Sequence, residues 1–423
     1  MQLLKESNID RIPGLIPVRY LRMAQSPFHF FRGSAIIQAR DLAHSAASGI
    51  TVQACGDCHL MNFGGFATPE RNLVFDINDF DETFPGPWEW DLKRLTVSIV
   101  LAARYRGFSK DNADDAVRAA VQAYRERMSE FAEMTKLETW YSQISVKDLR
   151  KYFQKDDVLL DRLEKAAKRG RTRTSEAIFP KLTKIVNGRA KIIDDPPFIF
   201  HHEQLGRPGW AKVQKDLLKQ YYRTLQTHHR QLLDHYSYED SAVKVVGVGS
   251  VGTRCFLILL LADEDDPLFL QAKEARRSVL EPPGRKSRFA HQGERVVTGQ
   301  RLMQSASDIF LGWTRGPERL ELYIRQLRDM KVSAEIETFD PHILTAYAAM
   351  CGWALARAQA KSGDPATVAG YLGSSQRFDD ALALYAEAYA DQVEKDFGNF
   401  KKAIRSGRFP TDSDAVGKLK FAI

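Results

Sequence analysis

The sequence predicts an α+β fold of two lobes, in which a compact β-rich segment interrupts a mostly helical chain. Apolar residues recur with the helical period over 88–134 and again over 341–360. Between them, residues 243–273 contain three apolar runs, separated by a glycine-rich turn and an acidic turn, as in consecutive strands. We therefore expect three segments: 1–239 as the first part of a large helical lobe, 240–330 as a small β-rich lobe, and 331–423 as the helical remainder.

The individual elements are expected from local signals along the chain. Prolines open the first helices, short apolar runs broken by Gly, Asn and Asp indicate strands, and Pro196-Pro197 marks a hairpin or extended excursion. In chain order we expect helices within 14–46, strands within 50–80, helices within 88–134, 147–168 and 211–236, an extended segment at 188–202, three strands within 243–273, a helix at 291–307, strands at 308–314 and 319–326, and helices at 341–360 and 377–405.

Composition restricts the class of protein. The chain has 423 residues and a formal net charge of +7, and its four cysteines are too few for a disulfide scaffold. The N-terminal residues lack the apolar core of a signal peptide, and the longest apolar run, 255–262, is too short to span a bilayer. The densest basic stretch, 166–174, contains no aromatic residue. We therefore expect a cytoplasmic protein that binds neither membrane nor nucleic acid.

The string CGDCHLMN, residues 55–62, supports three interpretations. Cys-x-x-Cys-His is the attachment signature of c-type haem, which would require export. Cys-x-x-Cys alone could be a redox pair, but such a pair normally opens a helix, whereas Gly64-Gly65 and a second strand follow here. The third interpretation uses Asp57 and Asn62, which have the D-x-x-x-x-N spacing of a kinase catalytic loop. There the Asp accepts the proton of a substrate hydroxyl and the Asn oxygen holds Mg²⁺.

A second acidic cluster supports the third interpretation. Asp76, Asp79 and Asp81 follow a short strand in LVFDINDFDET. Mg²⁺ prefers one or two carboxylates together with phosphate oxygens. We expect Asp79 and Asp81 to complete a magnesium site with Asn62. The alternative is that these carboxylates only cap the end of a strand.

Residues 247–252, GVGSVG, form a complete G-x-G-x-x-G motif, which occurs in dinucleotide folds and in kinase phosphate loops. A dinucleotide fold requires a helix to open at the last glycines, but the strand-like run TRCFLILLL follows instead. This indicates a strand–turn–strand flap that covers ATP phosphates with backbone amides. We place Gly247, Gly249, Ser250 and Gly252 in that flap.

Lys273, at the end of the next strand, is where a kinase-type lysine contacts the α- and β-phosphates. Such a lysine requires an acidic partner from the following helix. Glu281 and Glu294 are the candidates, and we include Glu281 in the expected nucleotide site, although the sequence does not choose between them. Glu274 would point away if the strand continues.

In ordinary kinases the glycine-rich loop and the lysine come first and the catalytic loop and the metal-binding Asp follow, whereas here the catalytic-loop string and Asp79 precede the glycine-rich loop and Lys273. A circular permutation explains this order, since the roles of site residues depend on their positions in space and permutation is tolerated where the joined ends lie close together. The fold class that we expect is therefore a circularly permuted, two-lobed protein-kinase-like fold.

Six strings resemble an uncharacterised bacterial family, domain of unknown function 2252 (DUF2252), which is grouped with the protein-kinase-like fold. Together they cover nearly the whole chain: RMAQSPFHFFRGSA, CGDCHLMNFGGF, FDINDFDETFPGPWEWDLKRL, QAKEARRSVLE, GERVVTGQRLMQSASDIFLGW and YLGSSQRFDDALALYAEAYADQ.

More distantly, the chain resembles aminoglycoside phosphotransferases and choline kinases. Their loop H-G-D-x-H-x-x-N is similar to residues 55–62, except that Cys55 replaces the first histidine. Their metal-binding I-D-F/W-E/D and downstream D-L-A strings are similar to residues 78–81 and 91–93. This resemblance implies that Asp57 is the base, that Asn62 and Asp79 bind the metal, and that Asp91 braces the catalytic loop. It assigns no substrate-recognition segment.

The leading hypothesis is an Mg²⁺- and ATP-dependent phosphotransferase that acts on a hydroxyl of an unidentified small molecule. His59, Arg22 and Arg32 are further candidates near the catalytic loop, and the two arginines could bind an anionic substrate. A nucleotidyl (AMP) transferase would use the same metal ligands. The alternative from a different class is a nucleotide-binding pseudokinase that acts as a regulatory interaction module.

Overall fold

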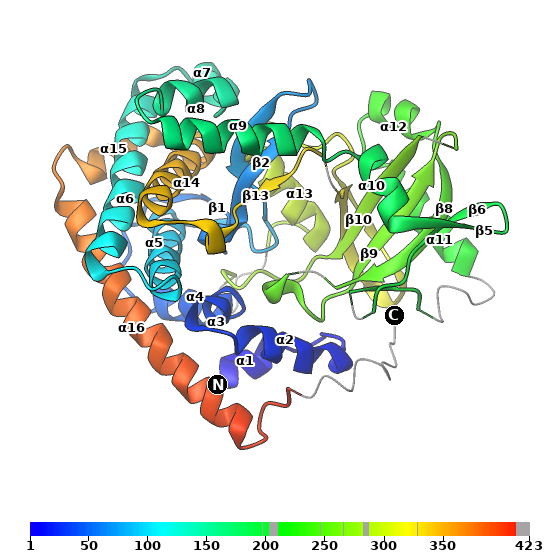
Figure 1. Ribbon diagram of the computed structural model, residues 1–423, viewed down its shortest axis with the longest axis horizontal. Coiled ribbons are helices and arrows are strands. Elements are labelled where there is room, and N and C mark those ends of the chain that lie inside the picture. Colours follow the sequence, from blue (N-terminus) through cyan, green and yellow to red (C-terminus); the bar gives the residue numbers. More distant parts are fainter. Residues whose placement is uncertain are drawn as a thin grey trace.

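Most of the helices lie in one part of the molecule and the largest sheet lies in another, with a few helices packed against the sheet (Figure 1). The computed structural model describes residues 1–411 except 197, 203–209, 246, 265, 282–286 and 328. The fold is mixed α+β with several sheets, as the sequence predicts at this level. Among the described residues, no helix is both long enough and apolar enough to cross a lipid bilayer.

The helical part is built around a closely packed pair, α6 (Lys110–Glu133) and α14 (Pro341–Ser362). Gly352 permits this close approach, because a Cβ at that position would lie 2.0 Å from the carbonyl oxygen of Ala120. Asp340 caps α14 by accepting from the amide of Ile343. The neighbouring helices are α5 (Trp88–Tyr105), α15 (Pro365–Leu372) and α16 (Arg377–Arg405).

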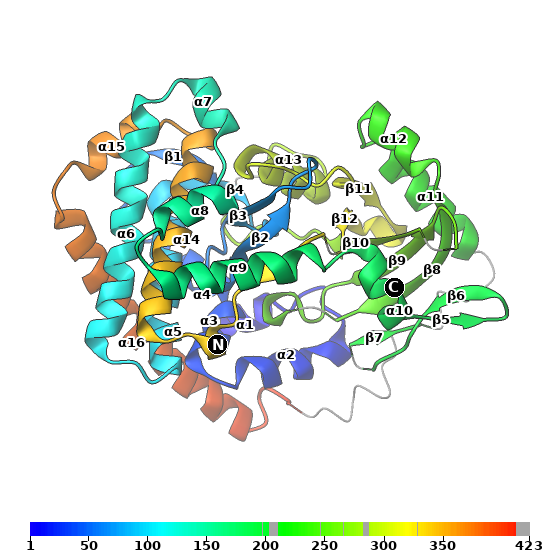
Figure 2. The ribbon, with the colours of Figure 1, turned by 45° about the horizontal axis from the view of Figure 1, so that its top comes forward.

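Two further groups of helices complete this part. The N-terminal group consists of α1 (Gln2–Glu6), α2 (Ile16–Met23), α3 (Pro27–Arg32) and α4 (Ala35–Ala43). The second group consists of α7 (Lys136–Tyr141), α8 (Val146–Tyr152) and α9 (Asp157–Arg171). Figures 1 and 2 both show α9 running from the helical part toward the large sheet.

Short strands fix two loops beside each other. Strand β1 (Thr51–Ala54) pairs with β4 (Phe84–Pro87), and β2 (Phe63–Ala67) pairs with both β3 (Leu73–Ile77) and β13 (Val332–Ser333). Residues 55–62 connect β1 to β2, whereas residues 78–83 connect β3 to β4. Because both connections run between the same two strand pairs, the two loops must lie next to each other.

The large sheet is antiparallel, with the strand order β11-β12-β10-β9-β8-β7. Its side chains alternate between two apolar clusters, as the period of a strand requires: Leu257 of β9 packs on one face and Phe256 on the other. The strands are β7 (Ile199–Phe200), β8 (Ser237–Lys244), β9 (Cys255–Leu261), β10 (Pro267–Glu274), β11 (Gly312–Arg315) and β12 (Glu321–Gln326).

Helices and a hairpin cover both faces of this sheet. Side chains of α10 (Ser175–Leu182) and of β6 (Arg189–Ile192), which pairs with β5 (Thr183–Val186), join one cluster. Side chains of α11 (Trp210–Tyr222) and α12 (Thr227–Leu233) join the other. Helix α13 (Gln292–Met303) follows β10 in sequence.

Most expected elements are present with small shifts in their ends. The helices expected at 341–360 and 377–405 correspond to α14 and α16. The sequence predicts that the small lobe begins at residue 240. In the structure, the helices that pack on the large sheet begin earlier in the chain, with α10 at Ser175. The final residues of the expected segment 331–423, from 412 onward, lie outside the described residues.

Candidate functional site

Most of the expected site residues line one cavity of about 1060 Å³, whereas Asp91 and Gly252 are not part of its lining. The two adjacent loops, the glycine-rich loop and strand β10 all contribute to its wall. The predicted site residues that line it are Arg32, Asp57, His59, Asn62, Asp79, Asp81, Gly247, Gly249, Ser250, Lys273 and Glu281. Residues far apart in the sequence are therefore brought together at one polar cavity.

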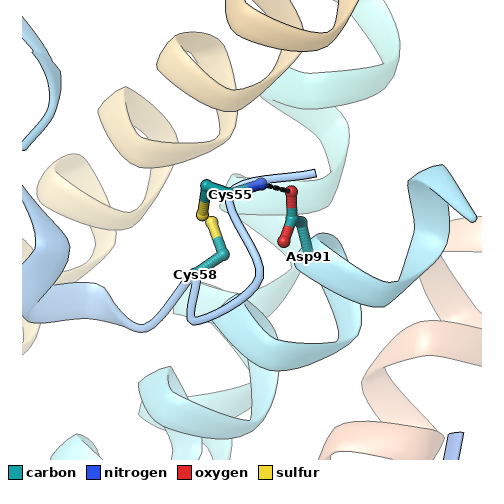
Figure 3. A group of neighbouring side chains, drawn as sticks. All are labelled: Cys55, Cys58 and Asp91. Carbon is teal, nitrogen blue, oxygen red and sulfur yellow. Dashed lines mark hydrogen bonds between the residues drawn. The ribbon is translucent and has the colours of Figure 1, made fainter. Parts of the chain in front are cut away.

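Asp91 braces the loop 55–62 from the first turn of α5 (Figure 3). Its carboxylate accepts hydrogen bonds from the backbone amides of Cys55, at 2.8 Å, and Gly56, at 2.9 Å. Burial raises the pKa of Asp91, while these two amides favour the ionised form. The bracing role that the resemblance implies is consistent with these hydrogen bonds.

Gly56 brings the loop 55–62 against the loop 78–83. Its φ is +89°, and a Cβ at this position would lie 2.3 Å from the carbonyl oxygen of Glu82. Both the left-handed conformation and the close backbone approach require glycine. This contact places Asp57 beside the loop 78–83, here called the acidic loop.

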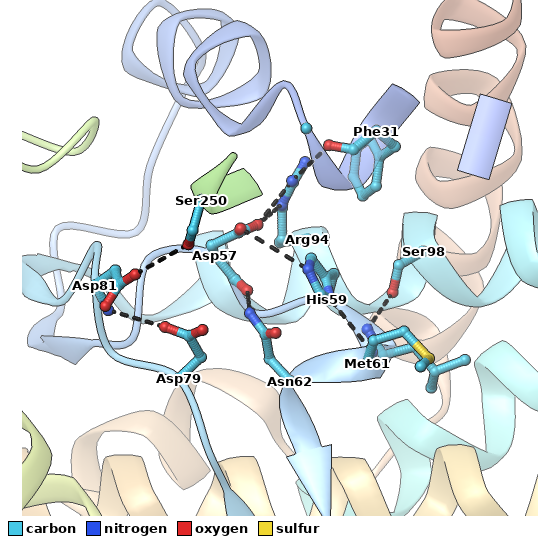
Figure 4. Close-up of polar contacts among 12 residues, drawn as sticks. Phe31, Asp57, His59, Met61, Asn62, Asp79, Asp81, Arg94, Ser98 and Ser250 are labelled. Carbon is cyan, nitrogen blue, oxygen red and sulfur yellow. Dashed lines mark hydrogen bonds and ion pairs between the residues drawn. The ribbon is translucent and has the colours of Figure 1, made fainter. Parts of the chain in front are cut away.

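Asp57 is held by Arg94, which lies on α5 one turn after Asp91 (Figure 4). The Arg94 guanidinium donates to Asp57 Oδ1 from Nε at 2.8 Å, and also to the carbonyl oxygen of Phe31. Asn62 donates from Nδ2 to the backbone oxygen of Asp57 at 2.7 Å. The carboxylate of Asp57 and the amide of Asn62 are thus both fixed in orientation.

His59 and the two cysteines of this loop are buried. Burial, followed by the charges of Arg32 and Arg94, lowers the pKa of His59 well below its ordinary value, so this histidine is neutral at pH 7. Its Nδ1 accepts from the amide of Met61, which fixes the ring. His59 therefore helps to shape the loop.

Cys55 and Cys58 are free thiols that lie close to Asp91 (Figure 3). Burial raises the pKa of both thiols, that of Cys58 to about 11, so both are protonated at pH 7. The Asp91 carboxylate already accepts a backbone amide on each of its two oxygens, which competes with metal binding at this group. These properties favour a packing role for the two cysteines.

Lys273 is buried, with 3% of its surface exposed, and faces the acidic loop. Its Nζ lies 2.6 Å from Asp81 Oδ2 and 3.8 Å from Asp79 Oδ2. Burial opposes the charged lysine, but Asp79 and Asp81 raise its pKa well above the ordinary value. The lysine is therefore a fixed positive charge in the cavity.

The expectation that Lys273 pairs with Glu281 or Glu294 is wrong for this structure. Glu281 instead forms an ion pair with Arg277, at 3.1 Å, and accepts from the amide of Ser287. The reason is spatial, because Asp81 lies beside the end of β10 and accepts a hydrogen bond from Lys273. Glu274 pairs with Arg254, away from Lys273.

The two carboxylates expected to bind metal differ in their surroundings. Asp81 accepts from Lys273 on Oδ2 and from the Tyr323 hydroxyl on Oδ1, and although burial opposes ionisation, Lys273 lowers its pKa. Asp79 accepts from the backbone amide of Asp81, and burial followed by the charge of Asp81 raises its pKa. Asp79 is therefore the carboxylate with more capacity for a cation.

The residues present fit a magnesium ion. The hydrogen bond from Asn62 Nδ2 to Asp57 leaves the amide oxygen of Asn62 as an available ligand. That oxygen and the Asp79 carboxylate are the hard oxygen donors that Mg²⁺ prefers, with water and phosphate completing an octahedron. Asp81 would serve the ion less directly, because its two oxygens already accept protein hydrogen bonds.

The glycine-rich loop lies over this arrangement. The Ser250 hydroxyl is 3.4 Å from Asp81 Oδ2 (Figure 4), and a Cβ at Gly249 would lie 3.3 Å from the carbonyl oxygen of Arg32. The Ser250 amide donates to the carbonyl oxygen of Gly247, so this amide does not point into the cavity as expected. On the outer side, Gly252 has a φ of +89° and accepts from the amide of Ile12.

Three side chains that organise the site are not anticipated by the sequence analysis. Arg94 could have been found, because residues three apart share a helix face and Asp91 already faces the loop. Tyr323, which donates to Asp81, carries no local signal. Arg295 of α13 donates to the carbonyl oxygens of Asp81 and Thr83, and these two hydrogen bonds fix the backbone of the acidic loop.

The comparisons with known proteins concern the family alone. No curated protein and no solved structure matches the chain. A family model described as an uncharacterized protein conserved in bacteria (DUF2252) matches residues 11–403. This match covers nearly the whole chain, including every candidate site residue, and the chain therefore belongs to the DUF2252 family.

Proposed function

We propose that this protein is an Mg²⁺- and ATP-dependent phosphotransferase that acts on a hydroxyl of a small molecule. The observation that carries the proposal is the convergence of Asp57, Asn62, Asp79 and Lys273 on one cavity beneath a glycine-rich loop. These four residues and the loop supply a base, two metal ligands and a phosphate-binding lysine, which are the parts that phosphoryl transfer from ATP requires.

The arrangement of the sheet supports a protein-kinase-like small lobe. The glycine-rich loop joins β8 to β9, Lys273 lies on the third strand, β10, and α13 follows that strand, as in kinases. A circular permutation accounts for the chain order, because α14 comes after the sheet and reaches the catalytic loop. There the Tyr347 hydroxyl lies 3.4 Å from the carbonyl oxygen of Leu60, and it donates to that of Phe63, the first residue of β2, at 3.0 Å.

The acidic partner of the lysine is the main departure from ordinary kinases, where a glutamate of the following helix pairs with it. In this chain Asp81 provides the carboxylate, whereas α13 presents Arg295 to the backbone of the acidic loop. The lysine and the acidic loop are thus linked directly. We propose that this link keeps Lys273 in place when α- and β-phosphates bind.

The proposed reaction follows from these positions. The acceptor hydroxyl lies against Asp57, and its oxygen attacks the γ-phosphorus while its proton passes to the carboxylate. The bond from the γ-phosphorus to the bridging oxygen breaks, and ADP leaves with that electron pair. When bound, Mg²⁺ supplies positive charge for the β- and γ-phosphate oxygens. Arg94 keeps the Asp57 carboxylate in a fixed orientation.

Nucleotide binding and turnover test the proposal separately. We expect ATP to raise the melting temperature more with Mg²⁺ than without it, and Asp79→Asn to abolish this magnesium dependence. Asp57→Asn should retain ATP binding but lose about 10²–10⁴-fold in ADP formation, because the base is removed. Asp111→Asn, the same change at an exposed position of α6, is the matched control.

The product identifies the reaction class. ADP release supports phosphoryl transfer, and release of pyrophosphate would instead indicate a nucleotidyl transferase. ATP binding with no turnover over a broad panel of metabolites would indicate a pseudokinase. If Asp57→Asn forms ADP as fast as the wild type, Asp57 is not the base.

A further inference from the structure

Four arginines line one wall of the same cavity: Arg11, Arg19, Arg32 and Arg276, here called the arginine wall. Three come from the N-terminal helices and the segment between them, and Arg276 follows β10. Within the described part of the chain, none of the four forms an ion pair with a carboxylate. This distinguishes them from Arg94 and Lys273, which both have carboxylate partners.

Arg11, Arg19 and Arg276 are held mainly by backbone oxygens. Arg11 donates to the carbonyl oxygens of Ser7 and Val251, and Arg276 donates to those of Ser7 and Ile9. Arg19, which is 1% exposed, donates to Asn8 Oδ1 and to the carbonyl oxygen of Gly33. Carbonyl oxygens orient a guanidinium but do not neutralise its charge.

The positive charges of this group act on one another. Burial, and then the charges of Arg19 and Arg276, lower the pKa of Arg11 well below its ordinary value. Glu82 and Glu274 counteract this shift, but neither forms an ion pair with Arg11. Holding like charges together in a partly dry wall is costly unless an anion binds there.

Arg32 extends the wall to the candidate base. Burial lowers its pKa, whereas the charges of Asp57 and Glu337 raise it, and its guanidinium lies 5.6 Å from the ring centre of Phe28. No hydrogen bond from its side chain to any described residue is present, and Nε is buried without a partner. Nε of Arg19 is also buried without a partner. Donors of this kind are available to a ligand.

We propose that the arginine wall binds the anionic group of the acceptor, which we infer to be a hydroxyl compound that carries a phosphate monoester. This inference rests on the proposed function, since it places the acceptor hydroxyl at Asp57. Planar guanidinium groups bind phosphate oxygens in pairs of hydrogen bonds. Lys273 and the metal ligands already account for the phosphates of ATP, so the wall serves the second substrate.

One face of α4 provides room for the rest of such an acceptor. The residues of α4 that line the cavity are three alanines, Ala35, Ala39 and Ala43, together with Ile36 and Arg40. The small alanine side chains leave space along the cavity beside Arg32. A short phosphorylated metabolite would lie along this face, with its phosphate on the wall and its hydroxyl toward Asp57.

Calorimetric titration with glycerol 3-phosphate tests the proposal without requiring turnover. The probe carries a phosphate monoester and hydroxyls, glycerol is its neutral counterpart, and inorganic phosphate separates binding of the anion from binding of the whole molecule. The titrations are made at constant ionic strength, with and without a non-hydrolysable ATP analogue and Mg²⁺. The variants are Arg32→Gln and Arg276→Gln, with the exposed Arg223→Gln as the charge-matched control.

We expect glycerol 3-phosphate to bind whether or not the nucleotide site is filled, and glycerol not to bind. Each wall variant should weaken binding at least about tenfold, whereas Arg223→Gln should not. Arg32 makes no hydrogen bond that the fold needs, so Arg32→Gln keeps the test valid even if Arg276→Gln does not fold. Phosphate binding equal to that of glycerol 3-phosphate would show that the wall recognises the anion alone.

Three results would overturn the proposal. These are competition between the probe and the ATP analogue, equal binding by the wall variants and the wild type, and absence of binding. Failure of the phosphotransferase proposal is seen separately, as absence of ADP formation in a protein that still binds the probe through the wall.

Discussion

The two sides of the cavity differ in how their charges are satisfied. On one side, the loops 55–62 and 78–83 are held by groups of the protein itself: Arg94 pairs with Asp57, two amides pair with Asp91, and Lys273 pairs with Asp81. On the other side, the arginine wall has carbonyl oxygens but no carboxylate partners among the described residues. The first side is organised before any ligand arrives, whereas the second is completed by one.

The largest expected effect comes from breaking the close approach of the two loops. Gly56→Ala should destabilise the protein by about 4 kcal/mol, because it adds a Cβ 2.3 Å from the Glu82 carbonyl oxygen at a left-handed φ. Gly49→Ala is the matched control: its φ is +81°, but no atom lies within 4 Å of the added Cβ, so we expect about 1 kcal/mol. Urea unfolding measures both.

Equal losses in these two variants would mean that only the backbone conformation matters at Gly56. The two loops would then not be in close contact in solution.

The next effect concerns the brace. Asp91→Ala leaves the buried amides of Cys55 and Gly56 without their acceptor, and we expect a loss of about 2–3 kcal/mol in the free energy of unfolding. Asp148→Ala removes a carboxylate from the first turn of α8 that caps only Ser145, and should cost about 1 kcal/mol. If Asp91→Ala is no worse than this control, the loop does not depend on its brace.

Sequence patterns were a better guide to the loops 55–62 and 78–83, which are held by other groups of the protein, than to the arginine wall. The elements of the fold could be predicted because their signals are local: α14 and α16 follow from the helical period, and β8 to β10 from the apolar runs and turns between them. What could not be predicted is how far the covering of the sheet extends, since α10 to α12 show only ordinary helical and turn signals.

The site follows the same division. Asp57 and Asn62 are five residues apart in one loop, and the acidic cluster that follows them closely in the sequence gave weight to that spacing. Asp81 and Lys273 are 192 residues apart, and their pairing depends on how the sheet sits on the loops, which no local pattern encodes. Arg11 and Arg276 are distant in the same way, and that neither has a carboxylate partner among the described residues can be recognised only in three dimensions.

Glu82 gives a smaller, pH-dependent effect at the boundary between the two sides. Burial raises its pKa to about 7, although Arg295 and the amide of Val279 favour ionisation. The folded state therefore binds the proton more tightly than the unfolded chain. Stability from this group is complete below about pH 4.5 and is lost as the pH rises through 7.

Glu82→Gln removes this dependence. Relative to the wild type, the variant should be more stable by about 1–2 kcal/mol at pH 8, a value reduced for the partial exposure of the side chain, with no such gain at pH 4.5. Urea unfolding at the two pH values measures the difference, and the acid measurement is the internal control. A gain that is the same at both values would assign the effect to packing and not to titration.

The smallest effect tests how strongly the glycine-rich loop is coupled to the loops 55–62 and 78–83. Ser250→Ala removes one contact of 3.4 Å to Asp81, while the bonds from Ile12 and Arg11 to the outer side of the loop remain. We expect less than about 0.5 kcal/mol of destabilisation, because a single long hydrogen bond contributes little. Amide hydrogen exchange should become a few-fold faster at 248–253 and stay unchanged at 55–62, since the brace of Asp91 is independent of Ser250. Faster exchange in both segments would mean that the glycine-rich loop and the loop 55–62 form one cooperative unit, and that the nucleotide we propose would have to loosen the loop 55–62 in order to enter beneath the glycine-rich loop.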